Sequence, residues 1–553
     1  MVRIANCSGF YGDRFGAAAE QLAGGPIDYL TGDYLAELTM AILGKARRRD
    51  PEAGYATTFL GQMEQVLGTA LDKGVRIVAN AGGLNPAGLA ARLRELTARL
   101  GLTATIVHIE GDDLTGRLGT VDGRDVLTAN VYLGSWAIVE ALRQGADVVV
   151  CPRVTDAALT VGPAAFHHGW GRTDWDRLAG AVVAGHVIEC GCQATGGNYP
   201  FLDEVRDPID PGFPIVEIAE NGEFVVTKHP GTGGLVSVGT VTSQLVYEID
   251  SPRYLTPDVT ARFDSVDLTQ DGPDRVRVRG VRGEPPPPTA KVCVNVEGGY
   301  RNTITFPLVG LDIERKADLV ERGLFARLDR DLFDAVHVDL VSGTGLRVTV
   351  QGRDPAAVGR SFTAAAVELG LASYPGFFLL DPPRAASAYT VTRSVLVAAD
   401  TVEQVVVGPG GQRTTVPLAH PADPFTVDLT PPPPADPPGG PVVRAPLGTV
   451  FGARSGDKGG DANVGVWGRD ADAYAWLAGH LTVERFTALL PGTRGLTVHR
   501  HELPRLFALN FVVRGLLGGG ASANPALDPQ AKSLGELLRA GTVELPAALL
   551  EGS

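Results

Sequence analysis

The first 160 residues alternate short apolar runs with longer amphipathic segments, and this alternation constrains the fold more than any other feature. A turn-forming residue such as glycine, asparagine or proline follows each apolar run within a few positions. Strands that recur with helices between them form βαβ units, and the strands of such units lie parallel in one sheet. We therefore predict an α/β fold with a mainly parallel sheet. The expected strands cover residues 2–7, 27–30, 75–79, 104–109 and 147–151.

The rest of the chain divides by composition. At 553 residues it is longer than one core commonly supports. We assign residues 1–385 to the N-terminal α/β domain, within which residues 185–300 are glycine-rich and alternate as strands do, so that we expect a β-rich insertion there. Residues 386–444 contain the run PPPPADPPGGP and favour an extended, proline-rich linker. Residues 445–553 are long enough for a small α+β domain.

The charge balance and the cysteine usage exclude several classes of protein. The formal net charge of −14 disfavours nucleic acid as a partner, because an acidic surface repels phosphates. The 5 cysteines are few and odd in number, which fits a reducing compartment. The start of the chain lacks a signal-peptide pattern, and no apolar run is long enough to cross a membrane. We expect a cytoplasmic protein with no membrane partner. The apolar run FALNFVVRGLL near the end suggests a homodimer or larger assembly.

Polar side chains cluster where the predicted parallel strands end. In open α/β sheets ligands bind at these carboxyl ends, so the residues there are the first candidates for a site. We predict that Asp13 and Asp156 act as catalytic acid and base, and that Arg153 holds an anionic substrate group. Alternatively, Asp13 and Asp33 only cap helices. The other expected substrate-binding residues at these ends are Ser8, Tyr11, Asn80, Gly82 and Gly83.

Two glycine-rich loops follow. In ECGCQATGGNYPF, Gln193 and Asn198 lie among glycines that let the backbone approach a ligand, and we expect both to bind substrate. Cys190 and Cys192 either act as a nucleophile beside a histidine base, or pack as small apolar side chains. Their spacing does not fit a zinc site, and we predict no metal. In KHPGTGG, His229 is the third expected catalytic residue, because histidine transfers protons near neutral pH.

The motif SGDKGGDAN, residues 455–463, is the most distinctive feature of the C-terminal domain. Lys458 lies between glycine turns and could present an ammonium group to a phosphate or carboxylate, so we include it among the substrate-binding residues. The same motif could equally form a tight hairpin. The chain has neither a G-x-G-x-x-G nor a Walker A motif, and no cofactor is predicted.

With these motifs the chain resembles the AtuA family, named for acyclic terpene utilisation. The segments that carry the resemblance span nearly the whole chain. They are RIANCSGFYGDR, YLTGDYLAELTMAIL, NAGGLNP, ECGCQATGGNYPF, KHPGTGGLVSVGTVTSQLVYEI and SGDKGGDANVGVW. The resemblance implies a large N-terminal domain followed by a small ferredoxin-like one. It also implies a part in the bacterial breakdown of citronellol- and geraniol-type compounds, which passes through coenzyme A thioesters of branched acids.

We therefore expect an enzyme that acts on a branched acyl-CoA, or a related carboxylic acid, by proton chemistry next to a carbonyl. A hydratase, dehydratase or isomerase would fit, with coenzyme A as part of the substrate and no other cofactor. Two alternatives stay open. One is a cysteine-dependent acyl-CoA hydrolase or transferase, and the other is a non-catalytic scaffold subunit of a catabolic complex.

Overall fold

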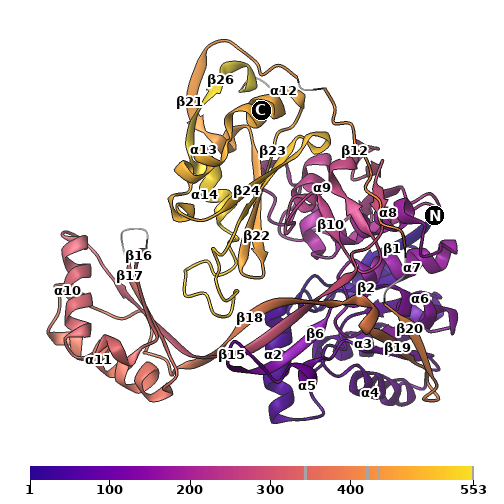
Figure 1. Cartoon of the computed structure of the whole chain (residues 1–553), viewed down its shortest axis with the longest axis horizontal. Helices are drawn as coiled ribbons and strands as arrows, with labels where there is room; N and C mark the ends of the chain where they lie inside the picture. Colours follow the sequence, from indigo (N-terminus) through magenta and orange to yellow (C-terminus); the bar gives the residue numbers. More distant parts are fainter. Residues whose placement is uncertain (342–344, 419–421, 434, 551–553) are drawn as a thin grey trace.

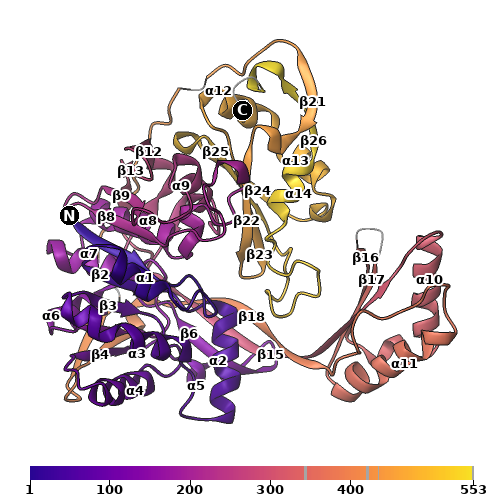
Figure 2. The same ribbon diagram turned by 180° about the vertical axis from the view of Figure 1, so that it is seen from behind.

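The computed structural model describes residues 1–341, 345–418, 422–433 and 435–550. Figure 1 shows a large α/β body, a C-terminal domain that sits on one side of it, and an arm that projects away from both. Figure 2 shows the same three parts from behind, with the arm separated from the large body by a pair of long strands.

The central strands of the large body are parallel, as the sequence predicts. Five strands pair in parallel, and β7 lies between β3 and β4 although it follows β4 in the chain. In sheet order they are β1 (Val2–Asn6), β2 (Tyr29–Gly32), β3 (Arg76–Ala79), β7 (Val148–Val150) and β4 (Ile106–Glu110). The fold class is therefore confirmed as α/β with a mainly parallel centre.

Antiparallel strands extend this sheet to eleven on both edges. On the β1 side the additions come from the predicted β-rich insertion: β8 (Pro214–Ile218), β9 (Phe224–Lys228), β13 (Val276–Arg279) and β12 (Asp267–Gln270). On the β4 side they are β19 (Glu403–Val407) and β20 (Arg413–Pro417).

Helices cover both faces of the sheet because its strands are apolar on both sides. Ile77 and Ala79 of β3 pack into one core, and Val78 between them packs into the other. The first face is covered by α1 (Ala17–Gly24), α3 (Thr57–Asp72) and α4 (Pro86–Arg99). The second is covered by α6 (Trp136–Arg143), α7 (Ala158–His168) and α8 (Trp175–Ile188).

The arm was not anticipated. Strand β15 (Thr289–Pro307) runs for 19 residues, pairing with β6 (Arg124–Val131) in the large body and with β17 (Gly345–Gly352) in the arm. Along its length it also pairs with β18 (Ser387–Ala398). The arm has a core of its own around Phe306 and Phe362. Its other elements are β16 (Ala335–Val341), α10 (Ile313–Phe325) and α11 (Phe362–Glu368).

The predicted linker at 386–444 is wrong over its first half. Residues 387–417 hold strands β18, β19 and β20, because alternating β-branched runs such as TVTRSVLV and VEQVVV find partner strands in the large body. Between β20 and β21 the described residues 418, 422–433 and 435–441 contain no strand, so the proline-rich connection is shorter than predicted. Its Pro434 lies outside the described residues.

The C-terminal domain is a small α+β unit, as predicted. Its four antiparallel strands, in sheet order, are β22 (Gly452–Lys458), β23 (Asp461–Trp467), β25 (Ala508–Val513) and β24 (Val498–Leu503). The core on one face includes α12 (Ala471–His480), α13 (Val483–Leu489) and α14 (Leu534–Ala540), and β21 (Val442–Pro446) pairs with β26 (Thr542–Pro546) at the side.

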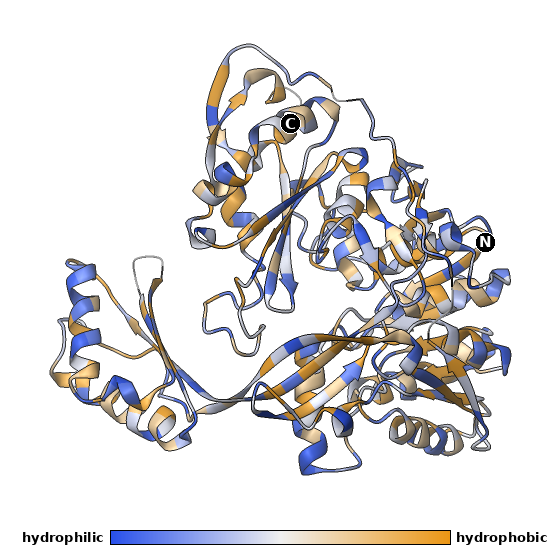
Figure 3. Ribbon diagram, viewed as in Figure 1, coloured by the Kyte–Doolittle hydropathy of each residue, from blue (hydrophilic) through white to orange (hydrophobic). Residues whose placement is uncertain are grey.

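The apolar run FALNFVV is accounted for within this domain, because every residue of β25 is buried. It gives no argument for assembly, and a homodimer stays a prediction. Figure 3 shows hydrophobic colour along the central strands, whereas α10 of the arm is largely hydrophilic. No helix among the described residues is long and apolar enough to cross a membrane.

Candidate functional site

The carboxyl ends of β2, β3 and β7 bring two acids, an amide and an arginine together. The Asn80 amide donates a hydrogen bond of 2.5 Å to Asp33, and its oxygen accepts one from the backbone N–H of Tyr34. The guanidinium of Arg153 donates to Asp156 at 2.8 Å and lies over the Tyr132 ring, 4.1 Å from its centroid. Parallel strands place their following loops on one edge, so residues distant in sequence meet there.

Glu189 joins this group from the end of helix α8. The side-chain amide of Asn6, the last residue of β1, donates to the backbone carbonyls of Ile188 and Glu189 and so fixes the helix end against the sheet. A cavity of about 10 Å³, enough for roughly one water molecule, lies between the groups. The polar side chains that line it are Asn6, Thr31, Asp33, Asp156, Thr160 and Glu189.

Burial disfavours the charged forms of two of these acids. The pKa of Asp33 and the pKa of Glu189 are both raised well above their usual ranges, first by burial and then by the negative charge of Asp156. Arg153 opposes both shifts without cancelling them. The protonated forms of Asp33 and Glu189 are therefore favoured beside Asp156, which is paired with arginine.

His186 lies next to Glu189 and stays neutral. Its Nδ1 is 3.2 Å from Glu189 Oε1, and its Nε2 is 3.1 Å from the Gln244 carbonyl. Burial, followed by the positive charge of Lys458, lowers the pKa of His186 to about 4. Within the described residues Glu189 Oε2 is buried and has no hydrogen-bond partner. That oxygen is available to a bound molecule.

The C-terminal domain reaches this group through the SGDKGGDAN motif. The motif forms a hairpin in which β22 and β23 pair up to Lys458 and Asp461, with Gly459 in the left-handed region at φ 64°. Asp461 stabilises the hairpin, because its carboxylate accepts a hydrogen bond of 2.7 Å from the Gly515 N–H. Lys458 instead lies over the Tyr254 ring, 5.3 Å from the centroid, and its charge lowers the pKa of Glu189.

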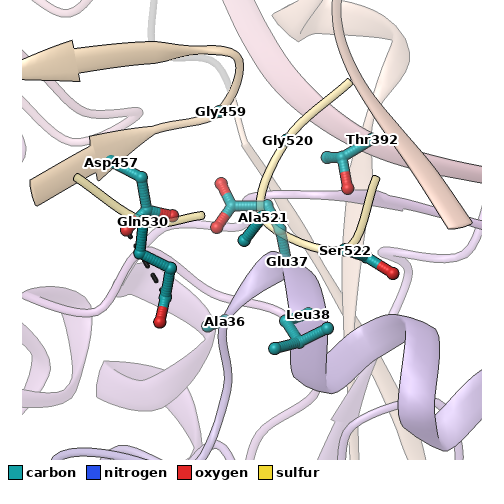
Figure 4. Close-up of a pocket in the computed structure, with 10 residues that line it drawn as sticks. All are labelled: Ala36, Glu37, Leu38, Thr392, Asp457, Gly459, Gly520, Ala521, Ser522 and Gln530. Carbon is teal, nitrogen blue, oxygen red and sulfur yellow. Dashed lines mark hydrogen bonds between the residues drawn. The ribbon is translucent and has the colours of Figure 1, made fainter. Parts of the chain in front are cut away.

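A second cavity, of about 30 Å³, lies between the start of α2 (Glu37–Arg49) and the C-terminal domain. Figure 4 shows that Glu37 and Asp457 line it from the two domains, with Gln530 hydrogen-bonded to Asp457. Glu37 also accepts from the Tyr132 hydroxyl at 2.7 Å and from Lys291 at 3.2 Å. Burial opposes its ionisation, but the charges of Lys291 and Arg153 outweigh burial and lower the pKa of Glu37.

Between the cavities the two domains are joined by a salt-bridged network. The Asn463 side chain accepts from the backbone N–H of Glu248 at 2.7 Å, and Glu248 has a positive φ of 56°. The Lys532 ammonium then bridges Glu248 at 2.9 Å and Asp457 at 3.2 Å. Burial and the charge of Glu248 raise the pKa of Asp457 to about 6. This network fixes the hairpin against the large domain.

Two of the residues predicted to be catalytic make their contacts elsewhere. Asp13 accepts hydrogen bonds of 2.7 Å from the backbone N–H groups of Gly9 and Arg14, so its carboxylate stabilises a turn. His229 Nε2 is 2.9 Å from the Gln21 carbonyl, and its ring packs against Gly24 at the end of α1. Backbone groups therefore occupy both side chains, so these contacts give no support to a catalytic role for Asp13 or His229, and both roles stay predictions.

The other predicted binding residues divide into three groups. Asn80, Arg153 and Lys458 lie in or beside the cluster. Gln193 and Asn198 face the C-terminal domain, where each accepts from Arg454 through its side chain and its backbone carbonyl, respectively. The remaining residues build the turns: Ser8 donates to the Phe10 carbonyl, Tyr11 packs against the core, Gly82 leaves no room for a Cβ, and Gly83 has φ 52°.

The surroundings of the two loop cysteines do not favour a nucleophilic role. Burial raises the pKa of Cys190 well above its usual range and that of Cys192 to about 12. A thiolate is the reactive form, so both shifts oppose nucleophilic attack. The alternative in which they pack as small side chains fits this environment. Among the described residues, no three His, Cys, Asp or Glu side chains are arranged to hold a metal ion.

Sequence reasoning missed several members of the cluster. The sequence places Asp33 at a strand end, with a helix cap as its alternative role, but not among the predicted catalytic residues, and it does not single out Glu189 from its loop. The signal for Glu189 is the helix before it, since residues 178–188 are all buried and a helix buried on every side must end inside the protein. Glu37, Tyr132 and Lys291 gave no local signal, because they meet through long-range strand pairing.

Comparison with known proteins agrees with this architecture. A family model described as acyclic terpene utilisation family protein AtuA matches residues 2–407, and one described as the AtuA ferredoxin-like domain matches residues 445–544. A comparison with curated proteins gives no match. Because the first model covers well over half of the sequence, the chain belongs to the acyclic terpene utilisation (AtuA) family, with a ferredoxin-like domain at its C-terminal end.

Proposed function

We propose that this protein is a lyase or isomerase that transfers protons at the carbon next to the carbonyl of an acyl-CoA thioester or a related carboxylic acid. One observation carries the proposal: Asp156, which is paired with arginine, shares a cavity with two acids, Asp33 and Glu189, whose raised pKa values favour their protonated forms. Carboxyl groups whose environments separate their pKa values in this way are suited to opposite roles in acid–base catalysis.

In a dehydration the roles are as follows. Asp156 takes the proton from the carbon beside the carbonyl, and the electron pair of that C–H bond forms an enolate with the carbonyl. The carbonyl then re-forms, and the enolate carbon–carbon pair forms the new double bond to the next carbon. The C–O bond to the hydroxyl breaks as Glu189 gives that hydroxyl its proton, so that it leaves as water. In an isomerisation the proton of Glu189 goes to the distal carbon instead. Asn80 and Arg153 hold Asp33 and Asp156 in place through hydrogen bonds of 2.5 and 2.8 Å.

The size of the cavities requires a movement of the protein. Spaces of about 10 and 30 Å³ are far smaller than an acyl thioester, so substrate entry needs the C-terminal domain to move from its present contact. The loop between β25 and α14 lines the second cavity through Gly520 and Ser522 and would move with it. Closure afterwards excludes water and strengthens the electrostatic contacts.

The two alternatives have less support. A cysteine hydrolase needs a thiolate and a base, whereas both candidate thiols have raised pKa values and His186 faces Glu189. A scaffold subunit has no need for buried, protonated acids, which cost free energy to desolvate. All five cysteines are unpaired, which fits the reducing compartment expected from the sequence.

The test is a panel of branched acyl-CoA thioesters incubated with the pure protein and followed by mass spectrometry. A gain or loss of one water, or an isomer resolved by chromatography, supports the proposal. Asp156→Asn and Glu189→Gln should each lower the turnover number by at least ~10²-fold, in line with the loss of a positioned acid or base.

Asp125→Asn and Glu220→Gln, which change exposed acids in the same chemical way, serve as matched controls and should keep full activity. Release of free coenzyme A would favour the hydrolase instead. Binding without turnover across the whole panel would favour the scaffold.

A further inference from the structure

Two lysines enter the domain interface from the ferredoxin-like domain, and their surroundings differ. The Lys532 ammonium is saturated: it contacts Glu248, Asp457 and the Tyr247 hydroxyl. Among the described residues the Lys458 ammonium has neither an ion pair nor a hydrogen bond, and its contact is the face of the Tyr254 ring at 5.3 Å. An aromatic face stabilises a cation without occupying its three N–H donors.

Contacts connect Lys458 to the acid cluster. The Tyr254 ring lies 5.2 Å from the His186 ring, centroid to centroid, and His186 Nδ1 is 3.2 Å from Glu189. The charge of Lys458 acts on both His186 and Glu189, which requires the ammonium to lie near them. Lys458 therefore approaches the cluster from the C-terminal domain, whereas Arg153 and Asp156 approach it from the end of β7.

The proposed reaction requires a second positive group beside the acid cluster, to stabilise the negative charge that forms on the substrate. When Asp156 accepts the proton, its own negative charge disappears and an equal charge develops on the carbonyl oxygen of the substrate. Arg153 is committed to Asp156 at 2.8 Å, and Lys291 is committed to Glu37 at 3.2 Å. Of the three cations compared within the described residues, Lys458 is the one whose N–H donors are available to that oxygen.

We propose that Lys458 binds the carbonyl oxygen of the thioester and stabilises the enolate that forms when Asp156 removes the neighbouring proton. This inference rests on the proposed function. The C–H bond breaks, its proton moves to the Asp156 carboxylate, its electron pair forms the carbon–carbon double bond, and the π pair of the carbonyl moves to the oxygen beside Lys458. The active site is then complete only when the ferredoxin-like domain is docked.

Steady-state kinetics test this role. Lys458→Met should lower kcat by ~10²–10³-fold, as for loss of one oxyanion donor, and should change KM by less than about threefold. Lys458→Arg should recover part of the rate, because it restores a positive donor. Lys73→Met is the matched control, because Lys73 is an exposed lysine of the large domain at the end of α3. An unchanged kcat in Lys458→Met, alongside an inactive Asp156→Asn, would overturn the inference while leaving the proposed function intact.

A binding measurement works without turnover. S-(2-nitroethyl)-CoA forms a nitronate that resembles the enolate, and calorimetry should show that Lys458→Met binds it at least tenfold more weakly than the unaltered protein or Lys73→Met. This result would support an oxyanion site even if no thioester in the panel reacts. Equal affinity in Lys458→Met, or no binding by the unaltered protein, would overturn the inference.

Discussion

Two pairs of acidic side chains in the large domain have surroundings that shift their pKa values in opposite directions. Glu248 and Glu37 each have a lysine partner, at 2.9 and 3.2 Å, and their pKa values are lowered. Among the described residues Asp33 and Glu189 have no lysine or arginine within ion-pair distance, and their pKa values are raised. A lysine partner therefore favours the ionised form of an acid, whereas burial without one favours the protonated form.

The largest expected effect on stability comes from replacing Arg153, the cation beside Asp156 and Asp33. Arg153 is 2% exposed, so Arg153→Met leaves Asp156 and Asp33 without their nearest positive charge. The free energy of unfolding should fall by about 3–5 kcal/mol, as for breaking a buried pair. Urea denaturation at pH 8 measures it. Arg48→Met, which breaks an exposed pair with Glu297, should cost less than about 1 kcal/mol. An equal loss of unfolding free energy in Arg153→Met and Arg48→Met would show that the buried and the exposed ion pair do not differ.

Asp112 is a third buried acid with a raised pKa, and it has no part in the proposed reaction. Asp112 accepts hydrogen bonds from Asn130 and from the backbone N–H of Arg153, yet burial raises its pKa from 3.8 to about 7. A raised pKa means that the folded state holds the proton more tightly than the unfolded state. Stability should therefore fall as pH rises from about 4 to about 7, and then level off.

Asp112→Asn should abolish this slope, matching the unaltered protein near pH 4 and exceeding it by about 2–4 kcal/mol at pH 8. Denaturation curves at several pH values measure the difference. A slope that persists unchanged in the variant would show that Asp112 is already ionised at neutral pH.

Loss of the lysine that pairs with Glu248 should have a smaller effect, on stability alone. Lys532→Met removes the cation between Glu248 and Asp457, but its side chain is 40% exposed and solvent screens the loss. We expect a destabilisation of about 1–2 kcal/mol, seen as a lower melting temperature, with turnover changed by less than about fivefold. A loss of turnover as large as that of Lys458→Met would mean that the two lysines do not differ in role.

The smallest expected effect concerns Asp13, which the sequence placed in the site. Because its carboxylate accepts only backbone N–H groups in a turn, Asp13→Asn should keep turnover within about twofold and cost about 1 kcal/mol of stability. The same thioester assay checks it. An inactive but folded variant would restore Asp13 to the catalytic group.

Much of the architecture was predictable because it depends on local periodicity. Strand and helix alternation predicted the parallel sheet. The rule that strand ends meet placed Asp13, Asn80, Arg153 and Asp156 together; the structure pairs Asn80 with Asp33 and Arg153 with Asp156, whereas Asp13 contacts a turn. The hairpin carrying Lys458 was one of the two forms expected for its glycine-rich motif. These features depend on residues that are close in sequence or on a general property of parallel sheets.

The rest depended on tertiary contacts that no local pattern encodes. Asp33 and Asp13 both follow a strand end, and only the packing around Asn80 makes one of them a buried acid. Glu189 enters the site because Asn6 fixes the end of α8. The arm and strand β18 arise because β15 is long enough to pair with β6 in the large body, with β17 in the arm and with β18 along its length, which proline counting cannot reveal.

We expect Glu189 and Asp33 to hold protons at neutral pH beside the Asp156 side chain. Infrared spectroscopy measures this directly, because a protonated carboxyl group has a C=O stretching band that a carboxylate lacks. We predict such a band at pH 7 in the unaltered protein, reduced in Glu189→Gln and again in Asp33→Asn, and unchanged in the control Glu220→Gln. A spectrum at pH 7 in which neither Glu189→Gln nor Asp33→Asn removes any carboxylic acid signal would contradict the account.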